Sequence, residues 1–165
     1  MNTNLLKKNF NNIILSKSNS NINFFVTKKS FLDKNFSSLK DVFLEIKKIS
    51  EKEFGLQNNK IFSSYKNQNQ NHLISLDNGI LLINSLLEEL KKNCLIFFRL
   101  DKPILLSNQK STDIIFTLLT PNNIETSNKL QILAKLTRIL KKSNIRKEIK
   151  GIKKPEDVLA LLLLP

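Results

Sequence analysis

The apolar residues of this chain fall into two kinds of segment. Four short runs rich in isoleucine, leucine and phenylalanine have the length of buried strands, and they cover 22–26, 80–83, 95–100 and 114–120. Elsewhere apolar residues recur at helical spacing, over 39–54, 58–65, 125–140, 145–150 and 158–164. Because strands alternate with helices along the chain, the pattern predicts an α/β fold.

Residues that favour helix ends support two of these helices. Ser38 can cap the helix over 39–54, Asp41 follows three residues later, and Gly55 provides a stop. Pro155 suits the first turn of the last helix, and the two acidic residues after it favour a helix N-terminus. The boundaries of both helices are therefore predicted as well as their existence.

A turn and a polar pair flank the apolar run over 80–83. Asn78 and Gly79 both tolerate positive φ angles, so they predict a turn immediately before the strand. The run then stops at Asn84 and Ser85, and residues 86–92 are expected to form a loop or a helical turn. We expect the polar pair at the rim of the sheet, where binding or reacting side chains are often held.

A length of 165 residues with 41% hydrophobic residues fits one globular domain. We assign residues 1–20, rich in asparagine, serine and lysine, to a flexible extension, and residues 21–165 to the domain. The net charge of +13 would suit a polyanion. However, we interpret the lysines as a compositional bias, and no basic run of the chain has the interleaved aromatic residues that stack on bases. The sequence thus argues against nucleic acid as a partner.

Cys94 is the only cysteine, so the chain can form no internal disulfide and no cysteine metal cluster. Its apolar neighbours indicate a buried thiol in a strand. No apolar run reaches the roughly 18 residues that a membrane span needs, and asparagine interrupts the N-terminal apolar segment too often for a secretory signal. We expect a cytoplasmic protein with no cofactor, no bound metal and no membrane insertion.

The segment over 74–89 has the sequence I-S-L-D-N-G-I-L-L-I-N-S-L-L-E-E. It keeps Asn78 and Gly79 of the pattern T-G-I-G-N-G-x-A-I-P-H, in which a turn and a strand lead to a phosphoryl-carrying histidine. It also keeps, at 88–89, the acidic residues that follow this histidine a few positions later. In this respect it resembles the enzyme IIA proteins of the bacterial phosphotransferase system, of the fructose/mannitol type and the nitrogen-regulatory class. Asn84 takes the place of the histidine, and Ile83 takes the place of the proline before it.

Three later segments resemble the same family in order. They are L-D-K-P-I at 100–104, T-D-I-I-F-T-L-L-T-P at 112–121 and L-A-K-L-T-R-I-L at 133–140. The family's counterparts are L-x-x-P-I, V-D-L-L-F-A-L-L-V-P and L-A-x-L-A-R-L-L. The family has a second histidine at the start of the helix that contains L-A-x-L-A-R-L-L, and Lys129 stands at that position in this chain. The resemblance extends over roughly 24–164.

This resemblance implies a single domain with a central mixed β-sheet of about five strands, covered by helices on both faces. It also implies that no catalytic residue remains. A phosphocarrier histidine attacks phosphorus with an imidazole nitrogen, whereas the lone pair on the amide nitrogen of Asn84 is delocalised. The loop over 67–72 has glutamine and asparagine where the family has glycine and arginine, so a phosphate pocket is expected to be poor.

We therefore expect a degenerate, non-phosphorylatable member that acts by binding other proteins. The resemblance implies regulated transporters or kinases as partners, and also the histidine phosphocarrier protein. The expected binding surface comprises Asn78, Gly79, Asn84, Ser85, Glu88 and Glu89. Ser85 is interpreted as a surface hydroxyl, and the two glutamates as a solvated pair or a remnant of a docking edge.

Two alternatives stay open. In the first, the chain is an active phosphoryl carrier of the phosphotransferase system and uses His72, its only histidine, as a relocated nucleophile. In the second, it is a small basic nucleic-acid-associated domain, for which the net charge is the argument. Labelling with phosphate distinguishes the first, and salt-dependent binding to nucleic acid distinguishes the second.

Overall fold

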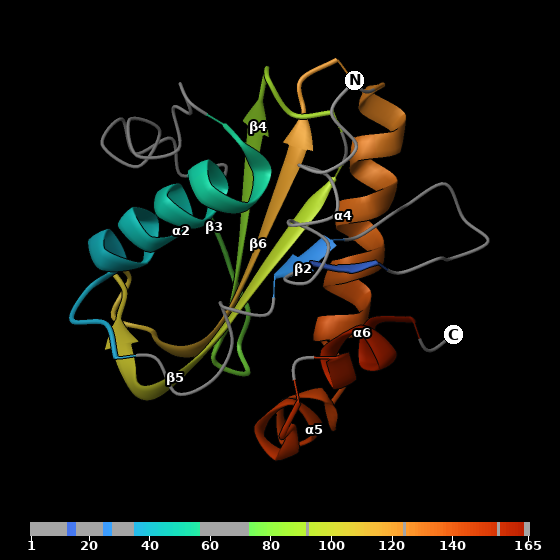
Figure 1. Cartoon of the computed structure of the whole chain (residues 1–165). Coiled ribbons are helices and arrows are strands. Elements are labelled where there is room, and N and C mark those ends of the chain that lie inside the picture. Colours follow the sequence, from blue (N-terminus) through green and yellow to red (C-terminus); the bar gives the residue numbers. More distant parts are fainter. Residues whose placement is uncertain are drawn as a thin grey trace.

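The structure, a computed structural model, describes residues 13–15, 25–27, 35–56, 73–91, 93–123, 125–154 and 156–163 (Figure 1). The elements in these ranges build one sheet with helices on both sides. The helix predicted over 58–65 and the loop over 67–72, with His72, lie outside the described residues, as does most of the extension predicted over 1–20.

Six strands form the sheet in the order β1-β2-β5-β6-β4-β3, where the sequence predicted about five. Their bounds are β1 Ile13–Leu15, β2 Phe25–Thr27, β3 Leu73–Ser75, β4 Ile80–Leu87, β5 Cys94–Leu105 and β6 Ser111–Pro121. The pairs β2/β5 and β4/β6 are parallel, whereas β1/β2, β3/β4 and β5/β6 are antiparallel. The sheet is therefore mixed, as predicted, and β1 falls within the stretch assigned to the extension.

Helices cover the sheet on both faces, as predicted (Figure 1). Helix α2, Leu39–Phe54, lies on one face, and α4, Thr126–Leu140, α5, Ile145–Gly151, and α6, Glu156–Leu163, lie on the other. Alternate residues of β4 join the two cores. Leu81 and Ile83 pack in the cluster that includes α2, and Ile80 and Leu82 pack in the cluster that includes α4 to α6. This alternation follows from the period of two in a strand.

The ends of α2 confirm the capping prediction. The backbone N–H of Ser38 donates to the Asp41 carboxylate over 3.1 Å, which is half of a capping box. At the other end Gly55 has a φ of 67°, the left-handed conformation that stops a helix. Val42 and Ile46 are completely buried, so the apolar stripe of this helix faces the sheet.

Strand β5 has an irregularity where it was expected to end. The antiparallel pairing of β5 with β6 runs from Cys94 opposite Leu119 to Leu105 opposite Ser111, with a register shift between Arg99 and Ile104. Pro103 lies in that interval, and proline without an N–H is tolerated in a strand at such irregularities. The two strands are consequently longer than the apolar runs that predicted them.

The predicted end of β4 is wrong. The strand continues past Ile83 to Leu87, and it pairs in parallel with β6 through Asn84 opposite Leu118 and Ser85 opposite Leu119. Ile83 has the backbone N–H that a proline would lack, so the pairing is not interrupted there. Residues 86 and 87 therefore belong to the strand and not to a loop.

Candidate functional site

Asn84 lies within β4, towards the edge of the sheet at which the parallel strands β4 and β6 both end. The last register pair of these strands is Leu87 with Pro121. Immediately beyond it the backbone N–H of Asn122 donates to the carbonyl of Leu87 over 3.2 Å. The pair Asn84 and Ser85 was expected at the rim, but Asn84 precedes the end of the strand by three residues.

The Asn84 side chain is half-buried on the face covered by α4 to α6. It shares this face with Ile80 and Leu82, two and one alternations earlier in the strand. Its carboxamide oxygen is buried and has no hydrogen-bond partner within the described part of the chain. The group that stands at this position is therefore a neutral amide with an unused acceptor, and it has no nucleophilic nitrogen.

Lys129, at the second family histidine position, lies in the first turn of α4 on the same edge of the sheet. Its ammonium group donates to the carbonyl of Asn122 over 3.0 Å, and Asn122 is the residue bonded to the end of β4. The structure thus brings Asn84 and Lys129 to one edge through the ends of β4 and β6. A lysine there supplies a positive charge but no imidazole.

Ser85 corrects another prediction, because it is not a surface hydroxyl. It is 5% exposed and lies on the α2 face of β4, one alternation after Ile83. Asn84 and Ser85 therefore point to opposite faces of the sheet. Glu88 and Glu89 follow in a turn and are exposed, as expected of a solvated pair.

Asn78 and Gly79 lie at the opposite end of β4, where they stabilise the turn before the strand and its contact with α4. The Asn78 amide donates to the carbonyl of Leu140 over 2.8 Å, which satisfies an acceptor at the end of α4. Gly79 has a φ of 77°, as the turn prediction requires. A Cβ atom at Gly79 would lie 2.8 Å from the guanidinium of Arg146, so the glycine also leaves room for that side chain.

Beside this turn, Asp113 accepts from two cations. The Arg146 guanidinium makes a two-point contact with its carboxylate at 2.6 and 2.8 Å, and the Lys150 ammonium lies 2.5 Å from it. Burial alone would raise the pKa of Asp113, but the hydrogen bonds and charges of Arg146 and Lys150 outweigh it, so the pKa lies below its ordinary value. In the sequence Asp113 belongs to a family motif, and nothing there indicates its partners.

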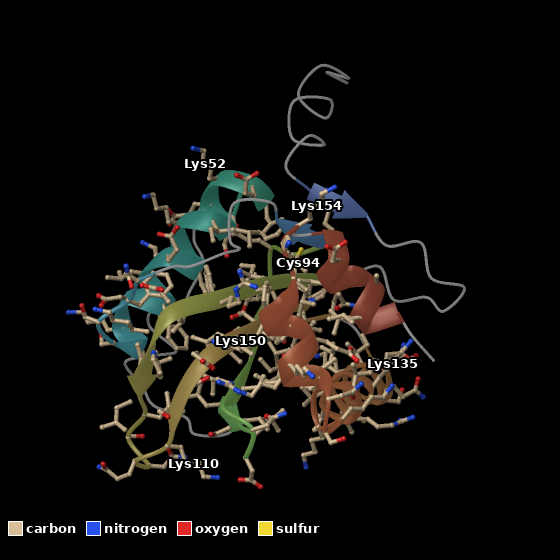
Figure 2. All side chains as sticks on the ribbon, turned by 90° about the horizontal axis from the view of Figure 1, so that it is seen from below. Lys52, Cys94, Lys110, Lys135, Lys150 and Lys154 are labelled. Carbon is tan, nitrogen blue, oxygen red and sulfur yellow. The ribbon has the colours of Figure 1, made fainter. Side chains whose placement is uncertain are left out.

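A surface cleft of about 460 Å³ opens next to this ion cluster. It is lined by Leu76, Asp77, Asn78, Gly79, Lys110, Ser111 and Arg146. Lys110 pairs with Asp77 at 2.8 Å, and this hydrogen bond, together with the charges of Lys110 and Lys141, lowers the pKa of Asp77. Figure 2 shows Lys110 at the far end of the β5/β6 hairpin.

The six residues of the predicted binding surface consequently do not form one surface. Asn78 and Gly79 precede β4, and Glu88 and Glu89 follow it. At about 3.3 Å per residue the two ends of this segment are separated by roughly 30 Å. The edge with Asn84 and Lys129 and the cleft with Arg146 are therefore two separate regions of the molecule.

Cys94 contributes no chemistry at either end of β4. Cys94 is buried, and burial raises the pKa of its thiol to about 12, so the reactive thiolate is suppressed. Across the ranges that the structure describes, no three histidine, cysteine or acidic side chains are arranged to hold a metal ion. Within the same ranges no helix is long and apolar enough to span a bilayer.

Comparison with known families gives one match over most of the chain. Residues 23–164 match the model described as phosphoenolpyruvate-dependent sugar phosphotransferase system, EIIA 2. No curated protein matches the chain. The matched range includes β4, β6 and α4, and so it contains both ends of the sheet described above.

Solved structures share the fold. The nitrogen regulatory protein IIA-Ntr from Neisseria meningitidis is 24% identical, with a TM-score of 0.72, over 83% of this chain and 95% of that one. The mannitol IIA protein of Escherichia coli is 11% identical, with a TM-score of 0.61, over 81% and 95%. The complex of enzyme IIAMTL with phosphorylated enzyme IIBMTL from Escherichia coli matches at 12% identity and a TM-score of 0.63, over 84% and 97%.

Proposed function

Because the chain belongs to the EIIA type 2 family of the phosphoenolpyruvate-dependent sugar phosphotransferase system, we propose that it is a degenerate, nitrogen-regulatory member that acts by binding other proteins. The observation that carries this proposal is Asn84 at the position of the phosphoryl-accepting histidine. An amide there cannot accept a phosphoryl group, so the protein is held in the state that corresponds to an unmodified relative.

The surroundings of Asn84 support the loss of phosphoryl transfer. Its half-buried amide is followed in β4 by Ser85, which is buried and lies on the other face of the sheet, so this serine is not placed to act as the nucleophile instead. Lys129 replaces the second family histidine and is engaged by the carbonyl of Asn122. Neither position retains an imidazole, so neither can carry a phosphoryl group as the family histidine does.

The same edge supports a protein-binding role in the bacterial cytoplasm. Leu86 in β4 is 41% exposed and Leu130, next to Lys129 in α4, is 61% exposed, so two large apolar side chains flank the Asn84 edge. An apolar centre with charged neighbours such as Glu88 and Glu89 is typical of transient protein interfaces. A fold neighbour is solved in complex with a phosphorylated enzyme IIB protein. The proposed partners are regulated transporters or kinases, and the histidine phosphocarrier protein.

Phosphoryl transfer from phosphoenolpyruvate through enzyme I and the histidine phosphocarrier protein tests the proposal directly. We expect no label on the wild-type chain and none on an Asn108→His control, which adds a histidine at an exposed turn. Label on Asn84→His would show that the scaffold and the docking edge survive. Label on the wild type that His72→Ala removes would contradict the proposal and support the carrier alternative.

Docking is tested separately by titrating the histidine phosphocarrier protein into isotope-labelled chain. Leu86→Glu should weaken binding about tenfold or more, because it places a charge in the centre of the interface. Leu105→Glu is the matched control, since Leu105 is 63% exposed at the far end of β5. Equal binding by both variants would exclude the Asn84 edge as the docking surface for this partner.

A further inference from the structure

Among the helices and strands that the structure describes, the positive charge is concentrated in one part of the fold. Residues 125–154, which cover α4 and α5, contain ten lysines and arginines and two glutamates. Residues 35–56 and 73–123, which cover α2 and the four strands β3 to β6, contain nine basic and nine acidic residues, and residues 156–163, which cover α6, contain two acidic residues and no basic one. The charge excess over the described helices and strands is thus largely confined to residues 125–154.

Most of these cations face solvent. We define the basic surface by the exposed cations Arg138, Lys141, Lys142, Lys147, Lys150, Lys153 and Lys154. Asp113 is shared by Lys150 and Arg146, so one carboxylate faces two cations. In the portion of the chain that the structure describes, Arg138, Lys147 and Lys153 have no acidic partner. A large share of the charge is therefore available to a ligand.

Figure 2 labels two cations of this surface, Lys150 and Lys154. Lys150 and Lys154 belong to the side built by the last helices, and Lys135 on α4 and Lys52 on α2 lie on opposite sides of the view. Helix α2 carries four lysines and four acidic residues, so its own side is balanced. The basic surface is also separate from the Asn84 edge, because Lys141 to Lys150 follow the C-terminal end of α4 whereas Lys129 lies in its first turn.

The chemistry of the surface discriminates between classes of anionic partner. The exposed large hydrophobic side chains of the described residues are Leu44, Leu73, Leu86, Leu105 and Leu130, and none follows Leu130. The basic surface therefore lacks the apolar centre of a protein interface, from which lysine is normally depleted, and the apolar face of a membrane-binding helix. Residues 125–163 contain no aromatic residue that could stack on unpaired bases.

From these observations we propose that the basic surface of α4 and α5 binds the phosphate backbone of double-stranded nucleic acid, without reading its sequence. Lysine ammonium groups neutralise phosphates as point charges and release condensed counterions, and neither step needs a shaped pocket. Contacts by four or five cations give a slope of log K against log salt of about −4.

Binding of the full-length chain to a fluorescent duplex of about 20 base pairs, measured between 50 and 200 mM salt, tests this proposal. The wild type should lose about two orders of magnitude in affinity over this range. The triple variant R138Q/K147Q/K153Q removes three unpaired cations, so its salt slope should fall by about 2.7. The matched control, K40Q/K48Q/K52Q, removes the same charge from α2 and should keep the wild-type slope.

Three outcomes would overturn the proposal. They are a wild type that does not bind the duplex at 50 mM salt, equal slopes for the two triple variants, and tighter binding to polyglutamate or to anionic vesicles than to the duplex. Equal slopes would mean that total charge, and not this surface, attracts the nucleic acid. Circular dichroism melts of each variant verify that the comparison is between folded proteins. Failure of this proposal leaves the docking edge at Asn84 unaffected, because the two tests use different surfaces.

Discussion

Asp113 is the residue on which the ion cluster beside β4 depends. Its side chain is 10% exposed, and without its carboxylate the cations of Arg146 and Lys150 would face each other. We expect Asp113→Asn to lower the free energy of unfolding by about 1–3 kcal/mol, because a partly buried charge pair loses one partner. Urea denaturation measures this. Asp77→Asn is the control and should leave stability unchanged, since its pair with Lys110 is exposed to solvent.

The lowered pKa of Asp113 also predicts how stability depends on pH. A carboxyl whose pKa is lower in the folded state stabilises the protein above its unfolded pKa, near 4, and this contribution disappears as the pH falls through the folded pKa. Between pH 5 and pH 3 the wild type should therefore lose more stability than Asp113→Asn does. Parallel curves for the two proteins would show that Asp113 is not among the groups responsible.

Gly79 is the position where a side chain is least tolerated. It has a φ of 77°, and a methyl group added there would lie 2.8 Å from the guanidinium of Arg146. We expect Gly79→Ala to cost about 1–3 kcal/mol of stability, from backbone strain and displacement of Arg146. Gly151→Ala is the control, because Gly151 ends α5 with no atom near its Cβ position, and it should be neutral or slightly stabilising. Thermal melts of the two variants measure the difference.

Which of these residues could be predicted from the sequence depends on how far apart their partners lie. Asn84 was found because a local motif surrounds it, and Gly79 because a turn needs only neighbours. The contact of Asp113 with Arg146 joins residues 33 positions apart, and no local pattern indicates it. Ser85 was misplaced because its polarity suggested exposure, whereas the alternation of β4 directs it into the α2 core.

Strand β4 runs without interruption through Ile83, the residue that stands where the resembled family pattern has a proline. Ile83 is completely buried and pairs with Leu73 of β3 and Thr117 of β6, so it lies between two neighbouring strands. Ile83→Pro should destabilise the protein by about 3 kcal/mol or more, because proline removes a donor within the sheet. Ile83→Val, expected to cost about 1 kcal/mol, separates this effect from lost volume. Equal losses in urea denaturation would show that pairing through residue 83 contributes little.

The helices and strands were predictable where the sequence contains residues that typically begin or end an element. Helix α2 begins at a capping serine and ends at a left-handed glycine, and both were visible in the sequence. The strand β4 was predicted to end too early because two polar residues, Asn84 and Ser85, suggested the rim of the sheet. No proline or glycine interrupts the segment from there to Leu87. A polar side chain alone does not end a strand when the adjacent strands provide hydrogen-bond partners for its backbone N–H and C=O groups.

The molecule as a whole is organised by a sheet that is buried on both faces. The cluster with α2 and the cluster with α4 to α6 share alternate residues of β4, β5 and β6, which is why these strands are apolar almost throughout. That feature was predictable from the apolar runs. The separation of the Asn84 edge from the cleft at Arg146 was not, because it depends on the direction of β4 within the sheet.

The uneven charge of the molecule predicts a salt-dependent stability that is independent of any ligand. The excess of eight positive charges over 125–154 causes self-repulsion, which salt screens. Raising the salt concentration from 10 to 200 mM should therefore raise the melting temperature by about 2–5 °C. R138Q/K147Q/K153Q should melt at a higher temperature than the wild type at low salt, and its melting temperature should respond less to added salt.

K40Q/K48Q/K52Q leaves the acidic residues of α2 in excess, so its melting temperature at low salt should not rise. A wild-type melting temperature that is insensitive to salt would mean that charge repulsion on α4 and α5 does not limit stability.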